Sequence, residues 1–407
     1  MENVAISAQI NEASWFEKRC RSIVFAILGQ IKGAGIEVKE RDKTYKFGEF
    51  DNNNVCAQII VNDMATYVAL VKGGSIGAAE AYINHDWDTP DLTAMIRVFA
   101  KAQEVTDKFE KYVSWFTRLQ NKWFHYRNRN SKTGSKKNIL SHYDLGNELY
   151  TRFLDKEMMY SSAIYPDENA SLETAQLNKL DKICQRLELT EDDHLLEIGT
   201  GWGGLAIHAA GKYGCRVTTT TISDAQHEYA KNRIEKLGLS DKITLLKEDY
   251  RNLTGQYDKL VSIEMIEAVG FEYMDSFFKQ CNDRLKPGGK LLIQAITIAD
   301  QRFEHYLNNV DFIQRYIFPG GFLPSIELMA KQVSKNTSMV IEGLHDIGLD
   351  YAKTLADWRE RFLASWPELI NFGYDEQFKR LWLFYLGYCE GAFLERSTST
   401  VHMVARK

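Results

Sequence analysis

Short apolar runs alternate with amphipathic stretches through the second half of the chain. The runs that predict β-strands lie at 194–199, 215–222, 242–249, 257–265 and 289–297. The stretches that predict helices lie at 204–214, 224–238 and 273–285, and the second of them is capped by Asp224 and ended by Gly238. This alternation predicts an α/β fold, with a mostly parallel Rossmann-like sheet and helices on both faces. Ligands of such sheets bind beyond the carboxyl ends of the strands.

The first 127 residues show a different pattern, which predicts a smaller α+β N-terminal domain. A strand pair is predicted at 44–50 and 56–63, followed by a glycine-led helix and an Asp/Trp-rich turn within 73–92. A long helix is predicted from an apolar stripe with spacings of three and four residues, formed by Val105, Phe109, Tyr112, Phe116, Leu119, Trp123 and Tyr126. Residues 128–138 are polar, basic and contain Gly and Ser, which predicts a linker before a second domain at 139–407.

Composition narrows the class of protein. The 407 residues are 44% hydrophobic and 26% charged, as in globular proteins of two or three domains. The net charge of −5 argues against nucleic acid as a partner, and the six scattered cysteines predict reduced thiols without a metal site. With no run of 18 apolar residues and no basic segment followed by an apolar block at the start, we expect a cytoplasmic location.

A glycine-rich turn at 197–204, "EIGTGWGG", joins the first predicted strand of this half to its helix. Gly199, Gly201 and Gly204 satisfy the G-x-G-x-x-G pattern, which lets backbone amides approach a ligand at a helix start. A dinucleotide site would need an acidic residue about 20 residues further on. The second strand, "VTTTTIS", has no acid before Asp224, which weakens that interpretation. A turn that binds no ligand stays open on the glycines alone.

Further segments of this half resemble the class I S-adenosylmethionine-dependent methyltransferases. They are the glycine loop preceded by "HLL", "KEDY" at the end of the third strand, and "YDKLVSIEMIEAVG". In this class, Asp249 would face the adenine, where a carboxylate accepts a hydrogen bond from the exocyclic amine. A helix cap or a solvated loop acid is the alternative for Asp249.

Five longer blocks together resemble the cyclopropane-fatty-acyl-phospholipid synthase family, which includes mycolic acid and plant cyclopropane synthases. The blocks are "HYDLGNELY" (142–150), "MMYSSAIYP" (158–166), "SIEMIEAVGFE" (262–272), "DFIQRYIFPGGFLPS" (311–325) and "DIGLDYAKTLADWRERF" (346–362). The resemblance covers 139–407 strongly and 1–127 more loosely, through segments similar to the family's N-terminal lipid-associated domain. It implies S-adenosylmethionine as the methyl donor, the cis double bond of an unsaturated phospholipid acyl chain as the acceptor, and a cyclopropane fatty acid as the product.

The resemblance also implies which residues contact the methyl donor. Gln226 would hold the ribose hydroxyls in place of the missing acid. The implied cofactor-binding residues are Tyr160, Ser161, Gly199, Gly201, Trp202, Thr221, Ile222, Gln226, Asp249, Tyr250 and Arg251.

A bicarbonate ion beside the transferred methyl group is a further implication of the resemblance. Its implied ligands, which form the catalytic set, are Ser162, Glu267, Gln294, the Ile296 backbone and Tyr351. Ser162 stands where many members have cysteine, and Gln294 stands where bacterial and mycobacterial members have histidine; plant members share the glutamine. Unlike histidine, Gln294 orients a ligand but does not titrate near neutral pH. For Glu267, a carboxylate that favours a helix start is the alternative.

The implied chemistry sets requirements for the site. An alkene is a weak nucleophile, so the donor must be held in line with it in a dry site, and the resulting carbocation needs negative charge or π faces nearby. Closing the ring then requires a base within hydrogen-bond reach, and the resemblance implies that the bound bicarbonate helps to remove this proton. Candidate aromatic residues, each also explained by core packing, are Tyr143, Tyr160, Trp202, Tyr316 and Phe318. Other fates of the cation would give methylene, methyl-branched or furan-precursor chains. A lipid-binding protein without catalytic activity is the alternative from another functional class.

A basic, aromatic region between the two domains predicts contact with a membrane surface. From Lys111 to Tyr143 it contains eight Lys/Arg and no Asp/Glu, interleaved with aromatic residues. Such a segment would lie on an anionic bilayer, so we expect a peripheral protein at the inner membrane face. A helix packed between domains and followed by a solvated linker is the alternative. The family resemblance also suggests a homodimer.

Overall fold

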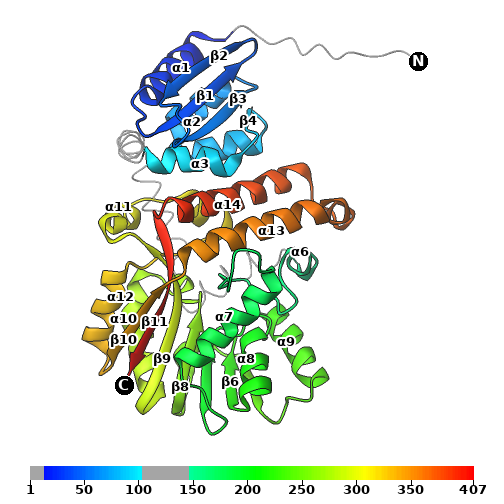
Figure 1. The fold of residues 1–407 in the computed structure, drawn as a ribbon, viewed down its shortest axis with the longest axis vertical. Coiled ribbons are helices and arrows are strands. Elements are labelled where there is room, and N and C mark those ends of the chain that lie inside the picture. The colour runs from blue at the N-terminus through cyan, green and yellow to red at the C-terminus, as the bar shows by residue number, and fades with distance from the viewer. Residues whose placement is uncertain (1–12, 103–145) are drawn as a thin grey trace. The chain divides into compact units, whose positions relative to one another are not determined.

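The structure is a computed structural model that describes residues 13–102 and 146–407 (Figure 1). The chain divides into two compact units, Met1–Phe116 and Thr117–Lys407, and each is described by itself. The predicted linker 128–138, the apolar stripe of 105–126 and Tyr143 lie outside the described residues. Within the described part of the chain, no helix is long and apolar enough to cross a membrane, and no group of three or more ligating side chains is arranged to hold a metal ion.

The described part of the N-terminal unit is a four-stranded sheet with three helices, as expected for an α+β domain. Its elements are α1 (Trp15–Leu28), β1 (Ala34–Glu40), β2 (Lys43–Gly48), β3 (Val55–Val61), α2 (Ala65–Ile83), β4 (Trp87–Asp88) and α3 (Leu92–Lys101). The strand order is β2-β1-β3-β4, so the two predicted strands are not paired with each other. β1 lies between them, antiparallel to β2 and parallel to β3, because a two-residue turn after Glu40 folds β2 directly back onto β1.

Helix α2 begins earlier than the glycine-led helix predicted for 73–92. It runs from Ala65 and is bent at Gly74, whose φ of 57° and ψ of −134° are non-helical. The bend brings the two halves of the helix together at Gly77, where an added Cβ atom would overlap the carbonyl oxygen of Ala69. The neighbouring Gly73 has nothing within 4 Å of the same position.

The C-terminal unit is a seven-stranded sheet flanked by helices. Its strands are β5 (His194–Ile198), β6 (Arg216–Thr220), β7 (Ile243–Leu246), β8 (Tyr257–Ile263), β9 (Leu285–Ile298), β10 (Val340–Asp346) and β11 (Thr398–Arg406). Its α-helices are α6 (Asn147–Phe153), α7 (Leu172–Arg186), α8 (Gly204–His208), α9 (Asp224–Lys236), α10 (Met274–Arg284), α11 (Phe303–Leu307), α12 (Ile326–Asn336), α13 (Gly348–Leu369) and α14 (Glu376–Leu394).

The strand order β10-β11-β9-β8-β5-β6-β7 confirms the predicted α/β fold. Strands β5 to β9 are parallel to one another and correspond to the five predicted runs. The sequence pattern did not predict β10 and β11, and β11 is antiparallel to both β9 and β10. The N-cap of α9 is Ser223, whose hydroxyl accepts from the Gln226 amide, so the predicted cap at Asp224 was wrong by one residue.

Apolar clusters cover both faces of this sheet. One packs α10 and α12 against β8 and β9, with Phe277 and Met329 among its members. The other packs α7 and α8 against β5 and β6, with Ile183 and Leu205 among its members. The helices on both faces leave the two ends of the strands as the places where a ligand can reach the sheet.

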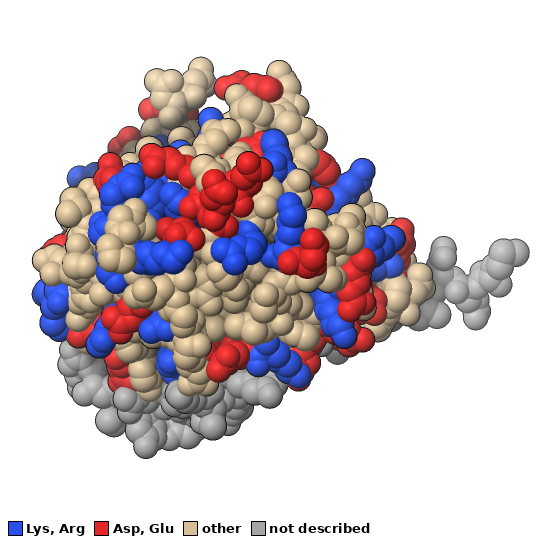
Figure 2. All heavy atoms as spheres, turned by 90° about the horizontal axis from the view of Figure 1, so that it is seen from below, with Lys and Arg blue, Asp and Glu red and all other residues tan. Residues whose placement is uncertain are grey.

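Strand β5 lies where the strand order reverses, because it is parallel to both β6 and β8 while the connections run to opposite sides. The amino ends of the parallel strands lie at the bottom of Figure 1, near the C-terminus. Figure 2 shows that end of the molecule, where acidic and basic side chains are interspersed over the described residues. Ion pairs near the amino ends of the strands include Lys290–Glu188 and Arg406–Glu342. A binding site is therefore expected at the opposite, carboxyl end.

We predict that Gly77→Ala destabilises the N-terminal unit, because its methyl group has no room beside Ala69. Overpacking of this kind costs roughly 1–3 kcal/mol. The matched change Gly73→Ala meets nothing within 4 Å and should be neutral or stabilising, since alanine is the better helix former. Thermal unfolding followed by limited proteolysis of the N-terminal unit would separate the two variants, and equal melting temperatures would contradict the close approach.

Candidate active site

The glycine loop leaves β5 at the reversal point of the sheet. Gly199, Gly201 and Gly203 have φ values of 102°, 52° and 90°, a region that side chains other than glycine rarely adopt. The amides of Gly199 and Thr200 donate to the Thr220 carbonyl and tie the loop to β6. An added Cβ at Gly201 would meet nothing within 4 Å, so the backbone there borders open space. This loop fits the methyl donor, because a ligand is able to approach its backbone closely.

The segment after β6 lies beside this loop. The Thr221 hydroxyl donates to Gln226 Oε1 over 2.9 Å, and both side chains are buried. The backbone amide of Gln226 donates to Ser223, whereas its side-chain nitrogen, Nε2, makes no hydrogen bond among the described residues. It is therefore free to donate to a ligand hydroxyl, as the predicted ribose contact requires. Ile222, between the two, is partly exposed.

After β7, the predicted adenine-side acid is engaged with a neighbour. Asp249 forms a bidentate ion pair with Arg251, with distances of 2.8 Å to Nε and 2.6 Å to Nη2. Its carboxylate also accepts from the Arg251 backbone amide and so caps a 3-10 turn at Tyr250–Asn252. The Tyr250 ring packs edge-on against Phe277, and burial raises the pKa of its hydroxyl to about 12. Asp249 thus serves as the turn cap that the sequence left as an alternative; contact with adenine remains a prediction.

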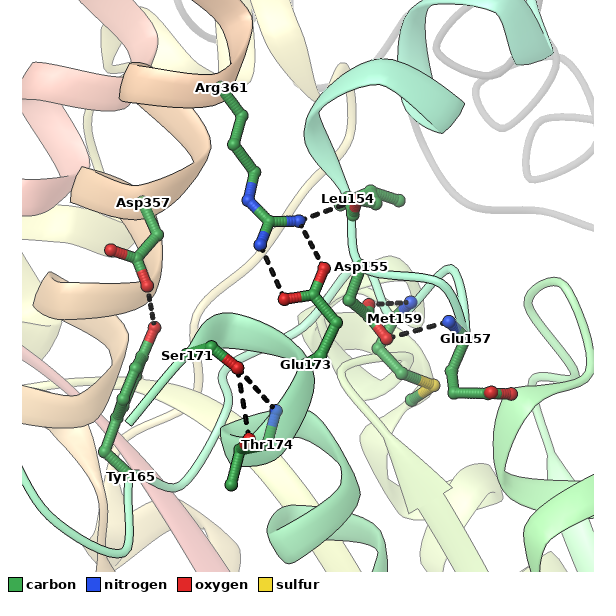
Figure 3. A network of polar contacts seen from close by, with 10 residues as sticks. All are labelled: Leu154, Asp155, Glu157, Met159, Tyr165, Ser171, Glu173, Thr174, Asp357 and Arg361. Carbon is green, nitrogen blue, oxygen red and sulfur yellow. Dashed lines mark hydrogen bonds and ion pairs between the residues drawn. The ribbon is translucent and has the colours of Figure 1, made fainter. Parts of the chain in front are cut away.

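A network of polar contacts fixes the segment 154–165, which carries Tyr160, Ser161 and Ser162 (Figure 3). Asp155 accepts from the amides of Glu157 and Met159 at 2.9 and 2.8 Å. From α13, Arg361 reaches the Leu154 carbonyl and forms a bidentate pair with Glu173 of α7. At the far end of the segment, the Tyr165 hydroxyl donates to Asp357 of α13 over 2.6 Å. Both ends of the segment are therefore held by the same helix.

The side chains of this segment face an aromatic cluster and a buried lysine. The Tyr160 hydroxyl lies 3.0 Å from the Tyr385 hydroxyl, and its ring packs near Trp358 and Phe318. The Ser161 hydroxyl accepts from Lys179 over 2.8 Å. These rings form an apolar wall, and its π faces lie beside the glycine loop at 197–204.

The other candidate aromatic side chains lie differently. The Trp202 ring is buried, contacts Tyr150 and donates to Asn147 of α6 over 3.0 Å, so it anchors the glycine loop to that helix. Tyr316 is 37% exposed and packs on Phe312. Among the described aromatic candidates, the structure brings the rings of Tyr160 and Phe318 together.

The carboxylate of Glu264 lies at the centre of the predicted catalytic set. Its Oε1 accepts from the Ser162 amide at 2.9 Å and from Gln294 Nε2 at 2.7 Å. Its Oε2 accepts from the Tyr351 hydroxyl at 2.8 Å. Glu264 directly follows β8, and its φ of 46° turns the chain toward β9. The structure thus brings Ser162, Gln294 and Tyr351 together, around an acid that the sequence analysis did not select.

Gln294 is fully buried, and both polar atoms of its side chain are hydrogen-bonded. Besides Glu264, its amide nitrogen donates to the Ser162 carbonyl over 3.3 Å, while its oxygen lies 2.8 Å from His402 Nε2. Arg186, always a donor, lies 2.5 Å from His402 Nδ1, so the ring must carry its proton on Nε2. Burial, with the charge of Arg186, lowers the pKa of His402 well below its usual value and keeps it neutral. This chain of donors fixes the orientation of the Gln294 amide.

Glu267 and Ile296 form a separate contact in the same site. Glu267 Oε1 accepts from the Ile296 amide over 2.6 Å, whereas its buried Oε2 has no hydrogen-bond partner. Burial, and then the charge of Glu264, raise the pKa of Glu267 to about 8. At neutral pH the pair of carboxyls therefore carries less than two charges, and Glu264, with three donors, is the better place for the negative charge.

A fully buried lysine supplies positive charge to this region. Lys179 of α7 has its pKa lowered to about 8 by burial, although the carboxylates of Glu264, Asp155 and Glu197 oppose this shift. Glu197, at the end of β5, has its pKa raised to about 8 by burial, while the Thr219 hydroxyl donates to it over 2.6 Å. The charges of Lys179, Glu197 and Glu264 have little access to water, so they must balance one another.

The predicted bicarbonate ligands do not form an empty anion site. The Ile296 amide is bound to Glu267, the Tyr351 hydroxyl to Glu264, and the Ser162 hydroxyl to the Ala163 carbonyl over 3.0 Å. Gln294 is engaged as described. The donors present therefore do not fit a bicarbonate in this conformation, because the chain's own oxygen atoms already accept from them.

Four residues of the site escaped the sequence analysis: Arg186, Lys179, Glu264 and His402. Glu264 stands three residues before Glu267 in "SIEMIEAVG", and two acids after one buried strand were a readable signal. His402 sits in the apolar run "TVHMVA", and a histidine there marks a buried polar contact. The partners of His402, which lie 108 and 216 residues away, were not readable from spacing.

Comparison with known proteins agrees with this fold. The sequence profile of the family described as mycolic acid cyclopropane synthetase matches residues 130–403. The cyclopropane-fatty-acyl-phospholipid synthase of Escherichia coli is 36% identical over 85% of this chain and 86% of its own length. A tuberculostearic acid methyltransferase of Mycobacterium tuberculosis is 35% identical over 79% of this chain and 76% of its own length.

Solved structures show the same relationship. A cyclopropane synthase of Mycobacterium tuberculosis superposes with a TM-score of 0.62 at 28% identity, covering 67% of this chain and 98% of that one. A mycolic acid cyclopropane synthase complexed with SAH also has a TM-score of 0.62, at 27% identity over 67% of this chain and 98% of that one. A coclaurine N-methyltransferase, at 17% identity and a TM-score of 0.59, shares the fold.

Fold and site together define a class I S-adenosylmethionine-dependent methyltransferase. Within this class, the chain belongs to the mycolic acid cyclopropane synthetase family, and it is an enzyme of the cyclopropane synthase type. S-adenosylmethionine is accordingly its methyl donor.

We predict that Glu267→Gln flattens the dependence of stability on pH. The folded state holds a proton on Glu267 up to about pH 8, whereas an ordinary glutamate releases it near pH 4.5. Wild-type stability should therefore fall as pH rises through this window, by up to roughly 1.4 kcal/mol for each pH unit from this one group. The variant lacks that contribution.

Denaturant unfolding midpoints measured across this window would test the prediction. The matched change Glu235→Gln removes an exposed carboxyl on α9, whose side chain is 56% accessible, and should leave the slope unaltered. Parallel curves for wild type and Glu267→Gln would show that Glu267 is ionised in the folded protein.

Proposed function

We propose that this protein transfers a methylene group from S-adenosylmethionine to the cis double bond of an unsaturated phospholipid acyl chain, giving a cyclopropane fatty acid. The observation that carries the proposal is the pair of partly buried acids, Glu264 and Glu267, next to an aromatic wall at the carboxyl end of the sheet. Such a site offers negative charge and π faces to a carbocation while excluding water.

The proposal of a phospholipid substrate is supported by how much of this chain one relative matches. The E. coli synthase, named for fatty-acyl phospholipids, matches 85% of this chain, which must include part of the first 129 residues. The mycobacterial cyclopropane synthase structure covers 67% of this chain with nearly its whole length. Part of the N-terminal region thus has a counterpart in a relative that is named for phospholipids.

The chain's own residues account for binding and positioning. S-adenosylmethionine, when bound, supplies an electrophilic methyl group. The backbone at Gly199 and Gly201 and the Gln226 amide would hold it, with the Asp249–Arg251 turn next to the adenine. The rings of Tyr160 and Phe318 would flank the acyl chain, where a cation–π contact contributes about 0.5–2 kcal/mol. Segment 154–165, held at both ends by α13, would keep this arrangement dry.

The resemblance implied that bicarbonate removes the final proton. Support for it in this chain is weak, because the donors of Ile296, Tyr351 and Gln294 already bind Glu267 and Glu264. The proposed reaction therefore uses no bicarbonate, and the site keeps two carboxyls within reach of its own donors.

A second candidate function is a fatty-acyl C-methyltransferase that gives a methylene or methyl-branched chain. It is favoured by the similarity to a tuberculostearic acid methyltransferase, at 35% identity over 79% of this chain. Both functions form the same cation and differ in which proton leaves. A methylene keeps an alkene, whereas ring closure removes it.

We also propose that the protein binds anionic bilayers peripherally, through its N-terminal unit and the basic region that follows. Trp15 and Phe16, at the start of α1, are 74% and 46% exposed. Arg19 and Lys72 lie over their rings at 5.9 and 5.5 Å, which combines apolar and basic groups as membrane interfaces favour. The eight Lys/Arg between Lys111 and Tyr143 extend this basic character.

Incubation with S-adenosylmethionine and monounsaturated phospholipid vesicles, followed by mass spectrometry of the acyl chains, tests the proposed reaction. We expect a gain of one CH2 with loss of the alkene. A gain with an alkene retained would identify the methylene product instead. No gain with any monounsaturated lipid would favour the non-catalytic lipid-binding alternative.

A matched pair of variants ties this product to the glycine loop. Gly201→Ala places a methyl group in the open space beside the loop and should raise the KM for S-adenosylmethionine about tenfold, equivalent to about 1.4 kcal/mol. Gly373→Ala has the same type of backbone, with φ of 91° and nothing within 4 Å, but lies after α13. It should change stability without changing that KM.

Vesicle flotation tests the membrane proposal. Binding should require anionic lipid and weaken with salt, at about 1 kcal/mol per basic residue near the surface. Lys/Arg→Glu changes across 118–137, or Trp15→Ala with Phe16→Ala, should weaken it. Lys231→Glu, on the exposed face of α9, serves as the control. Unaltered binding and salt dependence in the first two variants would contradict the proposal.

A further inference from the structure

Glu264 occupies an unusual backbone position for a glutamate. Its φ of 46° lies in the left-handed region that glycine adopts most easily. Its amide donates to the Gln294 carbonyl over 2.8 Å, which fixes the turn out of β8 against β9. A strained residue with a long acidic side chain, turned into the interior at the carboxyl end of the sheet, is explained by a role for that side chain.

Three donors from three separate elements converge on the Glu264 carboxylate. They are the Ser162 amide at 2.9 Å from segment 154–165, Gln294 Nε2 at 2.7 Å from β9, and the Tyr351 hydroxyl at 2.8 Å from α13. These are three of the five positions from which the family resemblance implies ligands for bicarbonate. Bicarbonate and a glutamate side chain present the same planar pair of oxygens to such donors.

The donor at Gln294 is built to meet an anion. Arg186 fixes the proton of His402 on Nε2, and that nitrogen lies 2.8 Å from the Gln294 oxygen. Gln294 must therefore turn its NH2 group toward Glu264, where it donates. Arg186 and His402, which lie behind Gln294, thus help to stabilise the negative charge of the Glu264 carboxylate.

We propose that the Glu264 carboxylate takes the place of bicarbonate in this protein and is the base that closes the ring. This inference rests on the proposed function. In the step, one C–H bond of the transferred methyl group breaks and its electron pair forms the third C–C bond of the cyclopropane. The proton passes to Glu264, which becomes a neutral carboxylic acid, and the positive charge on the acyl chain is discharged in the same event.

The surroundings of Glu264 match this role. Fully buried Lys179 balances the negative charge before the proton arrives, and its Nζ is bound to Ser161. The second carboxyl, Glu267, has an oxygen without a partner and lies next to Glu264 in the chain's own site. Because Glu267 itself holds a proton at neutral pH, the negative charge of the pair stays on Glu264.

Bicarbonate dependence of the full-length protein is the deciding measurement. Turnover should be the same in carbon-dioxide-free buffer and in buffer with added bicarbonate. Glu264→Gln keeps the size of the side chain but removes the base, so turnover should fall on the order of 10²-fold or more. Added bicarbonate should not restore it, because the space stays filled.

Glu264→Gly tests the same idea in the opposite way. It removes the carboxylate, relaxes the backbone and leaves three donors facing a space of carboxylate size. Turnover should be low without bicarbonate and recover when bicarbonate is added. Glu188→Gly is the matched control, because Glu188 also has a positive φ of 55° but its carboxylate pairs with Lys290 at the other end of the sheet. Its turnover should stay independent of bicarbonate.

Binding measurements give a readout that does not depend on turnover. Carbon-13 bicarbonate titrated onto each protein should bind to Glu264→Gly, raising its melting temperature, and should not bind to wild type or Glu188→Gly. Binding of S-adenosylmethionine shows that each variant is folded. Wild type that binds bicarbonate and loses turnover without it would overturn the inference, as would a Glu264→Gln variant with wild-type turnover.

Failure of the proposed function leaves a different result. If no monounsaturated lipid gains mass in either buffer, the proposed reaction is wrong. The carbon-13 titration then still decides whether Glu264 occupies the anion position, because bicarbonate bound by wild type would overturn that placement and bicarbonate bound by Glu264→Gly alone would support it.

Discussion

The site depends on placing a negative charge inside the protein. A carboxylate removed from water is costly unless donors replace its solvation. Glu264 is satisfied from three directions, by segment 154–165, β9 and α13, so each of these must stay in place for the charge to be tolerated. The outer contacts, Arg361 with Glu173 and Tyr165 with Asp357, hold that segment against α13. The positions of these three elements and the negative charge of Glu264 therefore depend on each other.

Periodicity predicted the centre of the fold well and its margins poorly. Strands β5 to β9 are short apolar runs between helices, and such local patterns are readable in a single sequence. β1 was overlooked because its partner choice depends on the tight turn after Glu40. β10 is a mostly exposed edge strand, and β11 returns from the end of the chain to lie between β9 and β10. Pairings of that range leave no local signal.

Family resemblance selected the right region of the site but not its centre. It named Ser162, Gln294 and Tyr351, which the structure brings together, and passed over Glu264, to which all three donate. The reason is physical: resemblance transfers residues one at a time, whereas a hydrogen-bond site is defined by what the donors share. Asp249 shows the same limit. The resemblance assigned this residue to the adenine, whereas its ion pair depends on a second residue of the same turn, Arg251.

The linked contacts of Arg186, His402, Gln294 and Glu264 also have an evolutionary consequence. Each member donates to the next, so replacing one alone leaves two donors or two acceptors facing each other in a buried place. Substitution at these positions must therefore proceed jointly. Within the family, the residues at positions 264 and 294, considered together, would distinguish proteins whose anion is a side-chain carboxylate from proteins that bind bicarbonate from solution.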